Sequence, residues 1–331
     1  MEDHAPTAGQ PRYARAIFFH NRLSGKATEQ ALASIRERIS SSIPAVEEYS
    51  VESEEITSEK VRRALASRPD LVVVAGGDGT VGMVASELVG TNTPLAIVPL
   101  GTFNNLALSL GLPLDPLAAC ALVENGSVTR IDIGVADEKN FFFEAAGAGV
   151  DAELFPIGEE IKRGRLLAIF QALSTVFAHR QTSVELKFDR TVNEAYQASF
   201  RGPTPLRRRR RFRKRKDRIR LRCSFVAVAN GPFYGTNLTV CPGAKIDDGL
   251  LTIAVYRDFS KRELALHLWS ISRGTYRLHP KIEKFESRWL EVFSRNRLPV
   301  HIDGRAIGTT PVRFGIRAGA LTVLVAPGGL R

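Results

Sequence analysis

An apolar run that stops abruptly in a glycine-rich turn limits the choice of fold for this chain. Residues 71–75 read Leu-Val-Val-Val-Ala, and residues 76–80 read Gly-Gly-Asp-Gly-Thr. Apolar residues without polar alternation are typical of a strand buried on both faces, as in a parallel sheet covered by helices. Residues 81–89 then repeat apolar side chains at helical spacing. The stretch therefore predicts a strand, a tight turn and a helix.

The turn itself indicates an anion-binding function. Gly76, Gly77 and Gly79 allow positive φ and leave bare backbone open to a ligand, and Thr80 can cap the helix with its hydroxyl. The first N–H groups of a helix bind anions, most often phosphate. The glycines also fit the dinucleotide fingerprint, but no acidic residue for the ribose occurs between residues 94 and 111. A dinucleotide site and a purely structural turn are the weaker alternatives.

Strand-like and helix-like segments alternate through the first 130 residues or so. Further strands are expected at residues 16–19, 46–51 and 95–98, with helices at residues 28–39 and 58–66. This alternation favours an open parallel sheet, in which ligands bind at the carboxyl ends of the strands. The loops at residues 76–80 and 99–105 both follow such ends.

From residue 141 the pattern changes to strand-like segments separated by turns. These segments are residues 183–188, 219–229, 251–256, 289–293, 299–302 and 321–326. They are typical of an antiparallel sandwich. Two helices are expected among them, one with an apolar stripe over residues 154–177 and one capped by serine over residues 260–270. The stripe indicates core packing, and an acyl-chain groove is its alternative.

Two of the loops together resemble those of the diacylglycerol kinase catalytic family. The turn at residues 76–80 is joined by Pro-Leu-Gly-Thr-Phe-Asn at residues 99–104, and both loops hold ATP in that family. The family includes bacterial lipid kinases, sphingosine kinases and ceramide kinases, and is distantly related to NAD kinases and 6-phosphofructokinases. The resemblance implies an open α/β nucleotide-binding domain of the 6-phosphofructokinase and NAD kinase type, followed by an antiparallel β-sandwich for the lipid substrate.

The resemblance also sets the expected domain boundaries. The ATP-binding domain is placed at residues 13–137 and the lipid-substrate domain at residues 138–325. A disordered N-terminus at residues 1–12 and a tail at residues 326–331 flank them.

The nucleotide site implied by the resemblance is built from three loops. Its residues are Asn21, Ser24 and Gly25 in the first loop, Gly76, Gly77, Asp78, Gly79 and Thr80 in the second, and Gly101, Thr102, Asn104 and Asn105 in the third. Asn105 departs from the family, in which an aspartate is usual. The amide removes one negative charge near the phosphates and keeps the ability to form hydrogen bonds.

The resemblance implies two positions for Mg²⁺. Asp132 lies in an expected strand, where the sequence alone leaves open a solvated face or a functional role. The family pairs it with Asp78, and two carboxylates can hold Mg²⁺ through water. In bacterial members an acidic loop carries a structural Mg²⁺, which here implies Asp248 with the backbone carbonyls of Lys245 and Leu250.

The catalytic residues implied by the resemblance are Asp303 and Asp78. Asp303 is the candidate base for the acceptor hydroxyl, and Asp78 places the metal near the phosphates. Arg305 follows where the family usually has a glutamate, so the site is less acidic than usual. An arginine there can pair with a phosphate or with an anionic lipid head group.

The net charge of +11 comes from one basic run. Between Arg207 and Arg222, twelve arginines and lysines stand against one aspartate, so the remainder of the chain is neutral overall. Such a run cannot lie in a core, and we expect it in an insertion at residues 201–218. Arginine-rich segments bind nucleic acid. An anionic membrane is the favoured partner, because a lipid-modifying enzyme without an anchor must find its substrate on a surface.

The remaining composition indicates a cytoplasmic protein that associates peripherally with the membrane. The sequence contains neither a run of eighteen apolar residues nor a signal peptide. Its three cysteines lack C-x-x-C spacing and are expected in the core, without disulfides or zinc. A sheet edge could pair across a two-fold axis, which would give a homodimer.

Taken together, these features predict an ATP-dependent lipid kinase that uses Mg²⁺ at the membrane surface, as in phospholipid biosynthesis. The acceptor is the hydroxyl of diacylglycerol or of a sphingoid- or ceramide-like lipid. Two alternatives stay open. Asn105 and Arg305 motivate an impaired member that only binds nucleotide or lipid, and the basic run motivates a nucleic-acid-binding protein.

Overall fold

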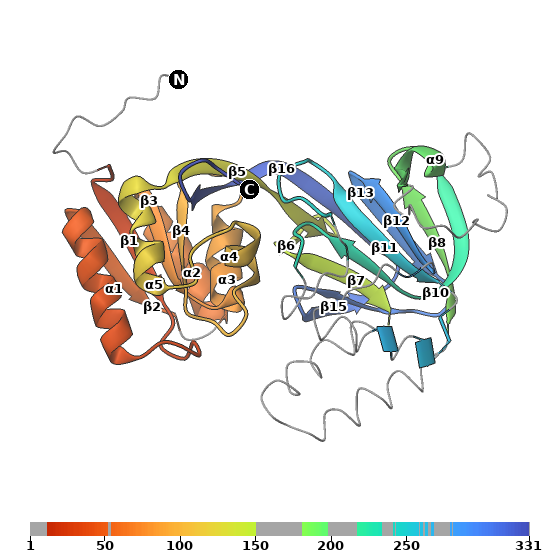
Figure 1. Ribbon diagram of the computed structural model, residues 1–331, viewed down its shortest axis with the longest axis horizontal. Coiled ribbons are helices and arrows are strands. Elements are labelled where there is room, and N and C mark those ends of the chain that lie inside the picture. The colour runs from red at the N-terminus through yellow and green to blue at the C-terminus, as the bar shows by residue number, and fades with distance from the viewer. Residues whose placement is uncertain are drawn as a thin grey trace. The chain divides into compact units, whose positions relative to one another are not determined.

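The computed structural model forms two compact units (Figure 1). It describes residues 12–51, 54–149, 181–197, 217–233, 241, 243–257, 259–260, 262–263, 266–267, 279 and 281–330. One unit is Met1–Ile131 with Gly319–Arg331, and the other is Asp132–Ala318. The expected helix over residues 154–177 and all of the basic insertion before residue 217 lie outside the described residues.

The first unit contains the predicted open α/β sheet. Its parallel strands are β1 (Arg15–His20), β2 (Ala45–Ser50), β3 (Leu71–Gly76) and β4 (Leu95–Pro99), in the order β2-β1-β3-β4. All six residues of β3 are buried, as the uninterrupted apolar run predicts. The sheet therefore has the expected fully buried strand next to β4.

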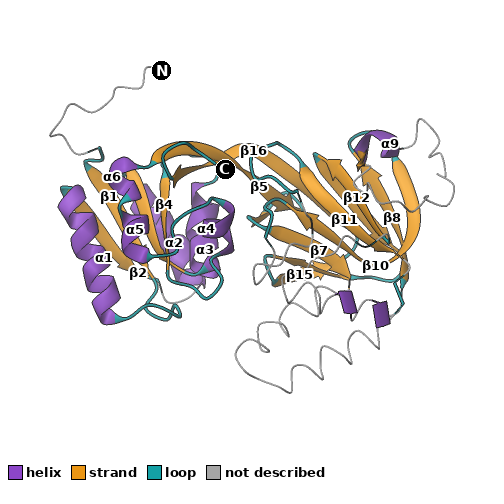
Figure 2. Cartoon of the chain, viewed as in Figure 1, coloured by secondary structure: helices purple, strands orange, loops and turns teal. Residues whose placement is uncertain are grey.

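Helices of the first unit accompany these strands, as the alternation predicts (Figure 2). They are α1 (Glu29–Ser42), α2 (Glu54–Leu65), α3 (Asp78–Leu88), α4 (Asn105–Ser109), α5 (Pro116–Cys120) and α6 (Leu122–Asn125). Helix α1 begins after Thr28, whose hydroxyl accepts a hydrogen bond from the Ala31 amide at 3.1 Å. Its apolar face packs on Phe18 and Val73 of the sheet. No helix among the described residues has the length and apolarity to cross a bilayer.

The last strand, β16 (Val312–Val325), contributes residues to both units. The boundary between the units therefore differs from the predicted domain boundary near residue 325. The first half of β16 pairs antiparallel with β13 (Trp289–Ser294), whereas Val323 pairs parallel with Leu95 of β4. Leu324 packs into the core of the first unit. Residues 319–331 thus return to the first unit because this strand end extends its sheet, although the sequence placed residues 321–326 in the sandwich.

The second unit is built from antiparallel strands. In addition to β13 they are β6 (Asn140–Phe142), β7 (Ala145–Gly149), β8 (Thr182–Phe188), β9 (Tyr196–Gln197), β10 (Arg218–Ala229), β11 (Leu251–Arg257), β12 (Ile282–Ser287), β14 (Pro299–Ile302) and β15 (Arg305–Thr309), with β5 (Ser127–Ala136) entering from the first unit. Strand β10 pairs with β8 through its first half and with β7 and β11 through its second half. Phe142, Phe188 and Phe314 lie in the core between these strands.

Several strands of the second unit escape the sequence patterns. Strand β7 reads Ala-Ala-Gly-Ala-Gly and β12 reads Ile-Glu-Lys-Phe-Glu-Ser, so neither carries the β-branched run that marks a strand. The predicted serine cap at residue 260 is confirmed, because Ser260 and Glu263 exchange hydrogen bonds of 2.8 and 3.2 Å. The three cysteines are buried, as predicted.

Candidate functional site

Three loops of the first unit meet at the carboxyl ends of β1, β3 and β4. Backbone hydrogen bonds join them, with the Asn21 amide donating to the Ala75 carbonyl at 3.1 Å and the Lys26 amide to the Leu100 carbonyl at 2.9 Å. The Leu100 amide donates in turn to the Gly76 carbonyl at 2.9 Å. The structure therefore brings together the three loops that the sequence assigns to one nucleotide site.

Glycine is required where the second and third loops touch. A Cβ atom on Gly101 would lie 2.5 Å from Cα of Gly77 and 2.8 Å from Oδ1 of Asn104. Neither glycine has positive φ, and φ of Gly77 is −92°. The positive φ that glycine allows is therefore not used at residues 76, 77 and 79. Gly77 and Gly101 serve the close approach of two backbones instead.

The side chain of Asn104 fixes the shape of the third loop. Asn104 adopts the left-handed conformation, with φ 55° and ψ 46°, which asparagine tolerates better than most residues. Its Oδ1 accepts from the Gly101 amide at 2.8 Å, and its Nδ2 donates to the Gly101 carbonyl at 2.9 Å. Asn105 follows, buried, and its Oδ1 has no hydrogen-bond partner among the described residues. A buried acceptor of this kind suits a ligand that donates a hydrogen bond.

Helix α3 begins at Asp78 without a side-chain cap, so the prediction that Thr80 caps it is wrong. Thr80 lies inside the first turn, where its Oγ1 accepts from Nδ2 of Asn21 at 3.0 Å. Gly76 makes room for it, since a Cβ there would lie 2.7 Å from Cβ of Thr80. The first turn of α3 consequently keeps uncapped N–H groups, which is the arrangement that binds anions.

Open space adjoins this helix start. Gly79 is exposed, and a Cβ there would meet nothing within 4 Å. Gly25 and Thr102 border the same loops, because a Cβ on Gly25 would lie 3.2 Å from Oγ1 of Thr102. The carboxylate of Asp78 accepts from the Leu106 amide at 3.4 Å. Bare backbone, uncapped amides and a nearby carboxylate fit a phosphate chain with its metal.

In the second unit, Asp303 lies at the turn between β14 and β15, with φ 42°. Its Oδ2 accepts from the Phe143 amide at 2.7 Å, and its Oδ1 accepts from the amides of Glu144 and Ala145 at 3.1 and 3.0 Å. The predicted base is therefore also held by the segment that leads into β7. Oδ2, with a single donor, keeps room for one more hydrogen bond.

The surroundings of the Asp303 carboxyl group raise its pKa. Burial raises the pKa most, while the three amides and His301 lower it. Asp303 is an exposed residue, but the amides of residues 143–145 enclose its carboxylate. The burial of the carboxyl group therefore decides the direction in which its pKa shifts. A raised pKa makes the carboxylate a better proton acceptor.

Asn230 links Asp303 to Asp132 through the backbone, and sequence patterns alone did not single it out. This fully buried residue donates from Nδ2 to the carbonyls of Asp132 and Phe143 at 2.9 and 2.8 Å. Asp132 is itself buried, and its Oδ2 accepts from the Gly249 amide at 2.6 Å. The solvated face considered for Asp132 is therefore wrong. Its pairing with Asp78, which belongs to the other unit, stays a prediction.

In the acidic loop at residues 245–250, Asp248 is exposed as a residue, but its carboxyl group is partly desolvated and lies near other carboxylates. Burial raises the pKa of Asp248, the hydrogen bond from the Leu250 amide at 3.0 Å lowers it, and the carboxylates of Glu286, Asp132 and Asp247 raise it further. A cation would relieve this repulsion. The described residues contain no group of three or more side chains that could hold a metal ion, so a cation here would need carbonyl oxygens as well.

Two family models match the chain. The diacylglycerol kinase catalytic domain matches residues 15–136, and the YegS C-terminal NAD kinase beta sandwich-like domain matches residues 145–325. The first match contains the three loops, and the second contains Asp248 and Asp303.

Curated relatives and solved structures agree with these models. The chain is 25% identical to a diacylglycerol kinase of Staphylococcus epidermidis, over 77% of this chain and 74% of the relative. It is 28% identical to a probable lipid kinase YegS-like of Pseudomonas aeruginosa, over 80% and 79%. A crystal structure of a putative diacylglycerol kinase from Bacillus anthracis superposes with a TM-score of 0.73 at 21% identity, covering 96% and 99% of the chains. The structural likeness shows the shared fold.

Proposed function

The chain belongs to the diacylglycerol and lipid kinase family, and we propose that it transfers the γ-phosphoryl group of ATP to the hydroxyl of a lipid, diacylglycerol or a sphingoid- or ceramide-like acceptor. The observation that carries this proposal is the meeting of three loops around an uncapped helix start. The close approach of Gly77 and Gly101, which shapes two of these loops, supports the same proposal.

Phosphoryl transfer depends mainly on positioning and on neutralising charge. The loops at residues 76–80 and 101–105 hold the phosphates, with the amides of the first turn of α3 as donors and the open side of Gly79 as the approach. Asn21, Ser24 and Gly25 border the nucleotide. Mg²⁺, held by Asp78, would neutralise charge on the transferred group.

Asp303 accepts the proton of the lipid hydroxyl. Its carboxylate is fixed by three amides, so little reorganisation precedes the transfer. The raised pKa favours proton uptake. Glu144 and Asn230 position Asp303 through the backbone segment to which it is bonded.

Transfer of labelled γ-phosphate from ATP and Mg²⁺ to extracted lipids in anionic vesicles tests the proposal. A labelled lipid is expected, and its chromatographic mobility identifies the acceptor. Bound nucleotide without any labelled lipid would contradict it and favour the binding-only alternative. Asn105→Asp and Arg305→Glu would then be the changes to examine for restored activity.

We further propose that the basic run between Arg207 and Arg222 attaches the protein peripherally to anionic membranes. The described end of this run is partly neutralised, because Arg218 and Arg220 pair with Glu185 at 3.4 and 2.7 Å. Attachment would thus depend on the remaining basic residues, each worth about 1 kcal/mol near an anionic leaflet. Binding to anionic vesicles that weakens with salt, without comparable binding to RNA, is the expected result.

The acidic loop gives a prediction about metal binding. Mg²⁺ at about one hundred times its Kd should raise the melting temperature by about 5 °C or more, because a cation relieves the repulsion around Asp248. Asp248→Asn should abolish this shift. In metal-free buffer the variant should melt no lower than the parent protein, since the amide oxygen can still accept from the Leu250 amide.

Asp247→Asn is the matched control, because Asp247 is exposed in the same loop as Asp248 but is not assigned to the metal. It should keep most of the Mg²⁺-dependent shift, which differential scanning fluorimetry measures. Equal shifts in the parent protein and in Asp248→Asn would refute a site at Asp248.

A further inference from the structure

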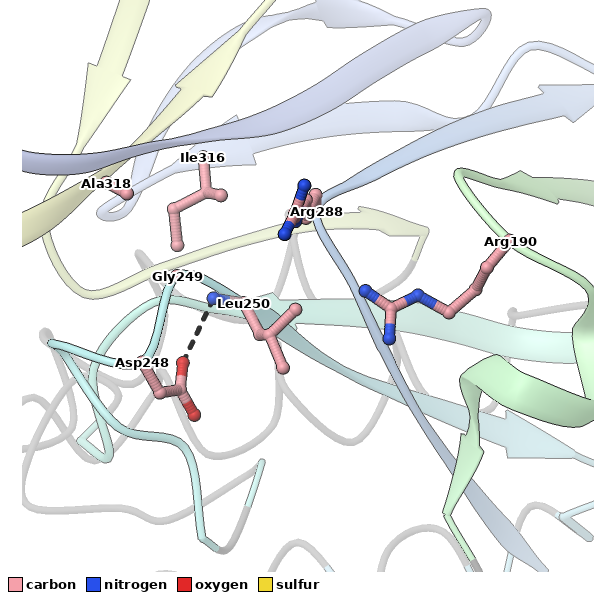
Figure 3. Close-up of a pocket in the computed structure, with 7 residues that line it drawn as sticks. All are labelled: Arg190, Asp248, Gly249, Leu250, Arg288, Ile316 and Ala318. Carbon is pink, nitrogen blue, oxygen red and sulfur yellow. Dashed lines mark hydrogen bonds between the residues drawn. The ribbon is translucent and has the colours of Figure 1, made fainter.

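A pocket of about 490 Å³ lies within the second unit, and its role is not explained by nucleotide or proton transfer (Figure 3). It is lined by Arg190, Asp248, Gly249, Leu250, Arg288, Ile316 and Ala318. The lining includes neither the nucleotide loops nor Asp303. Two arginines, Arg190 and Arg288, share this lining with apolar side chains.

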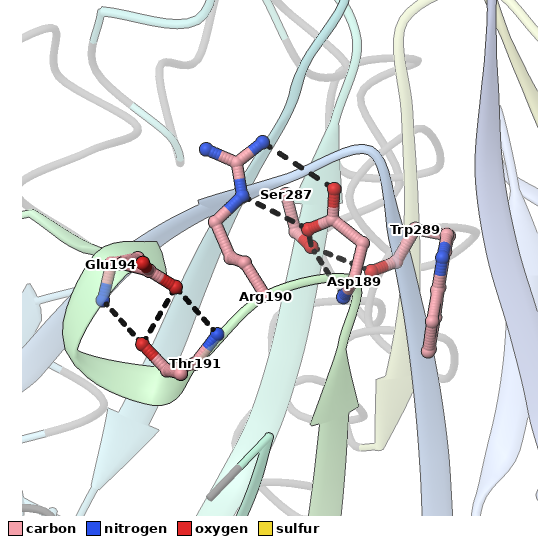
Figure 4. Close-up of polar contacts among 6 residues, drawn as sticks. All are labelled: Asp189, Arg190, Thr191, Glu194, Ser287 and Trp289. Carbon is pink, nitrogen blue, oxygen red and sulfur yellow. Dashed lines mark hydrogen bonds and ion pairs between the residues drawn. The ribbon is translucent and has the colours of Figure 1, made fainter. Parts of the chain in front are cut away.

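Arg190 is held in place by a partly buried polar network (Figure 4). Its Nε and Nη2 contact the two carboxylate oxygens of Asp189 at 3.1 and 3.4 Å. The hydroxyl of Ser287, which is fully buried, contacts the same carboxylate. This leaves Nη1 of Arg190 without a hydrogen-bond partner among the described residues, so the arginine is oriented and still has donors to offer.

Arg288 supplies the second positive charge. It is exposed at the corner between β12 and β13, and it makes no ion pair with the acidic residues that the structure describes. Its carbonyl accepts from the Ile316 amide at 3.0 Å. This hydrogen bond holds the turn between β12 and β13 next to Ile316, which lines the pocket. No residue in the described ranges accepts a hydrogen bond from the guanidinium of Arg288, so its donors are available to a ligand.

The rest of the pocket separates its one carboxylate from the arginines. Asp248 accepts from the Leu250 amide at 3.0 Å, and in Figure 3 the side chain of Leu250 lies between its carboxylate and the guanidinium group of Arg190. Leu250, Ile316 and Ala318 form the apolar part of the lining. A ligand would thus meet positive charge on one side and apolar surface on the other.

We propose that this pocket binds a phosphate group through Arg190 and Arg288. The planar fork of arginine matches phosphate oxygens and binds them in a bidentate manner. The shared chemistry is a terminal phosphate group, supplied either as free inorganic phosphate or as the head group of a lipid whose hydrocarbon part contacts Leu250 and Ile316. This site is separate from the nucleotide loops and goes beyond the proposed transfer reaction, although its lining shares Asp248 and Leu250 with the loop proposed to hold Mg²⁺.

Binding to the full-length chain is tested by titration calorimetry with two probes, inorganic phosphate and a short-chain phosphatidic acid kept below its micelle concentration. ATP and Mg²⁺ are left out, so the result does not depend on kinase activity. Arg288→Ala should weaken binding of the probe about tenfold or more, as expected for a lost hydrogen-bonded charge. Arg295→Ala removes an exposed arginine outside the pocket and should leave the affinity unchanged.

Arg190→Lys is a second variant, which keeps the positive charge but loses the planar guanidinium with its paired N–H donors. It should also weaken binding. Loss of affinity for both probes in the Arg288 and Arg190 variants identifies a general phosphate site. Loss for phosphatidic acid alone identifies a lipid head-group site that needs the apolar wall. Affinities equal to those of Arg295→Ala, or no binding by the parent protein, would overturn the proposal. Melting temperatures of all variants confirm that each is folded.

Discussion

Replacing Asp303 by asparagine is expected to lower kcat for lipid phosphorylation by about 100- to 10,000-fold, the usual contribution of a general base. The carboxylate is the group proposed to take the hydroxyl proton, and an amide cannot take it. ATP affinity should stay unchanged, because Asp303 has no part in the three nucleotide loops. Steady-state transfer of labelled phosphate and ATP titration measure the two quantities separately.

The substitution also has a structural effect. The asparagine Oδ1 can accept from one side of the segment at residues 143–145, but its Nδ2 then faces an amide donor. An unsatisfied buried N–H group costs about 1–3 kcal/mol, so the melting temperature should fall by several degrees. Kinetics are therefore measured well below the melting temperature, where both proteins are folded.

Asp137→Asn is the matched control. Asp137 also has positive φ, at 48°, and its carboxylate accepts from the Arg313 amide at 3.0 Å. It differs from Asp303 in that no reaction step is assigned to it. This variant should keep full activity, so a comparable loss of kcat would show that any disturbed turn of this kind impairs the enzyme.

The pH dependence of kcat/KM shows whether Asp303 acts as a catalytic base or only holds the backbone of residues 143–145 in place. Because the pKa of Asp303 is raised, the parent protein should lose kcat/KM as pH falls through this pKa and the carboxylate becomes protonated. Asp303→Asn should lose this acidic limb together with most of its rate. A variant that is slow but has an unchanged pH profile would mean that another group accepts the proton.

Much of the first unit could be predicted from the sequence, because its signals are local. The run at residues 71–75 is apolar without interruption, which only a doubly buried strand explains, and β3 is buried throughout. The three loops follow strands that pair in parallel, so their meeting follows from topology. The family resemblance then supplied the nucleotide, which periodicity alone does not indicate.

The features that escaped prediction depend on contacts between distant residues. Thr80 has the composition of a helix cap, yet its hydroxyl accepts from Asn21, 59 residues earlier in the chain. In the sequence Asn230 resembles a turn residue. In the structure its Nδ2 donates to the carbonyls of Asp132 and Phe143. The end of β16 reads as one more strand of the sandwich, and only its pairing with β4 places it in the first unit.

Replacing Gly101 by alanine is expected to reduce ATP affinity by about 100-fold or more and to destabilise the protein. The new methyl group would lie 2.5 Å from Cα of Gly77 and 2.8 Å from Oδ1 of Asn104. The first of these is backbone and cannot rotate away, so the two loops must separate. Overpacking of this kind costs about 1–3 kcal/mol or more. ATP titration and thermal unfolding measure the two effects.

Gly79→Ala is the informative comparison, since both changes add one methyl group to the same site. At Gly79 the methyl would meet nothing within 4 Å, and φ there is not positive. Alanine in place of glycine inside a helix stabilises by up to about 1 kcal/mol, so the melting temperature should hold or rise. ATP affinity should nevertheless fall, because the methyl takes the space assigned to the phosphates.

The two variants should therefore move stability in opposite directions and ATP affinity in the same direction. A fall in affinity in Gly101→Ala alone would show that loop geometry matters without showing where the phosphates lie. The fall in Gly79→Ala, in a protein at least as stable as its parent, has no structural cause other than a ligand against that helix start. If Gly79→Ala binds ATP as tightly as the parent protein, the phosphates do not lie at the first turn of α3, and the assignment of this site is wrong.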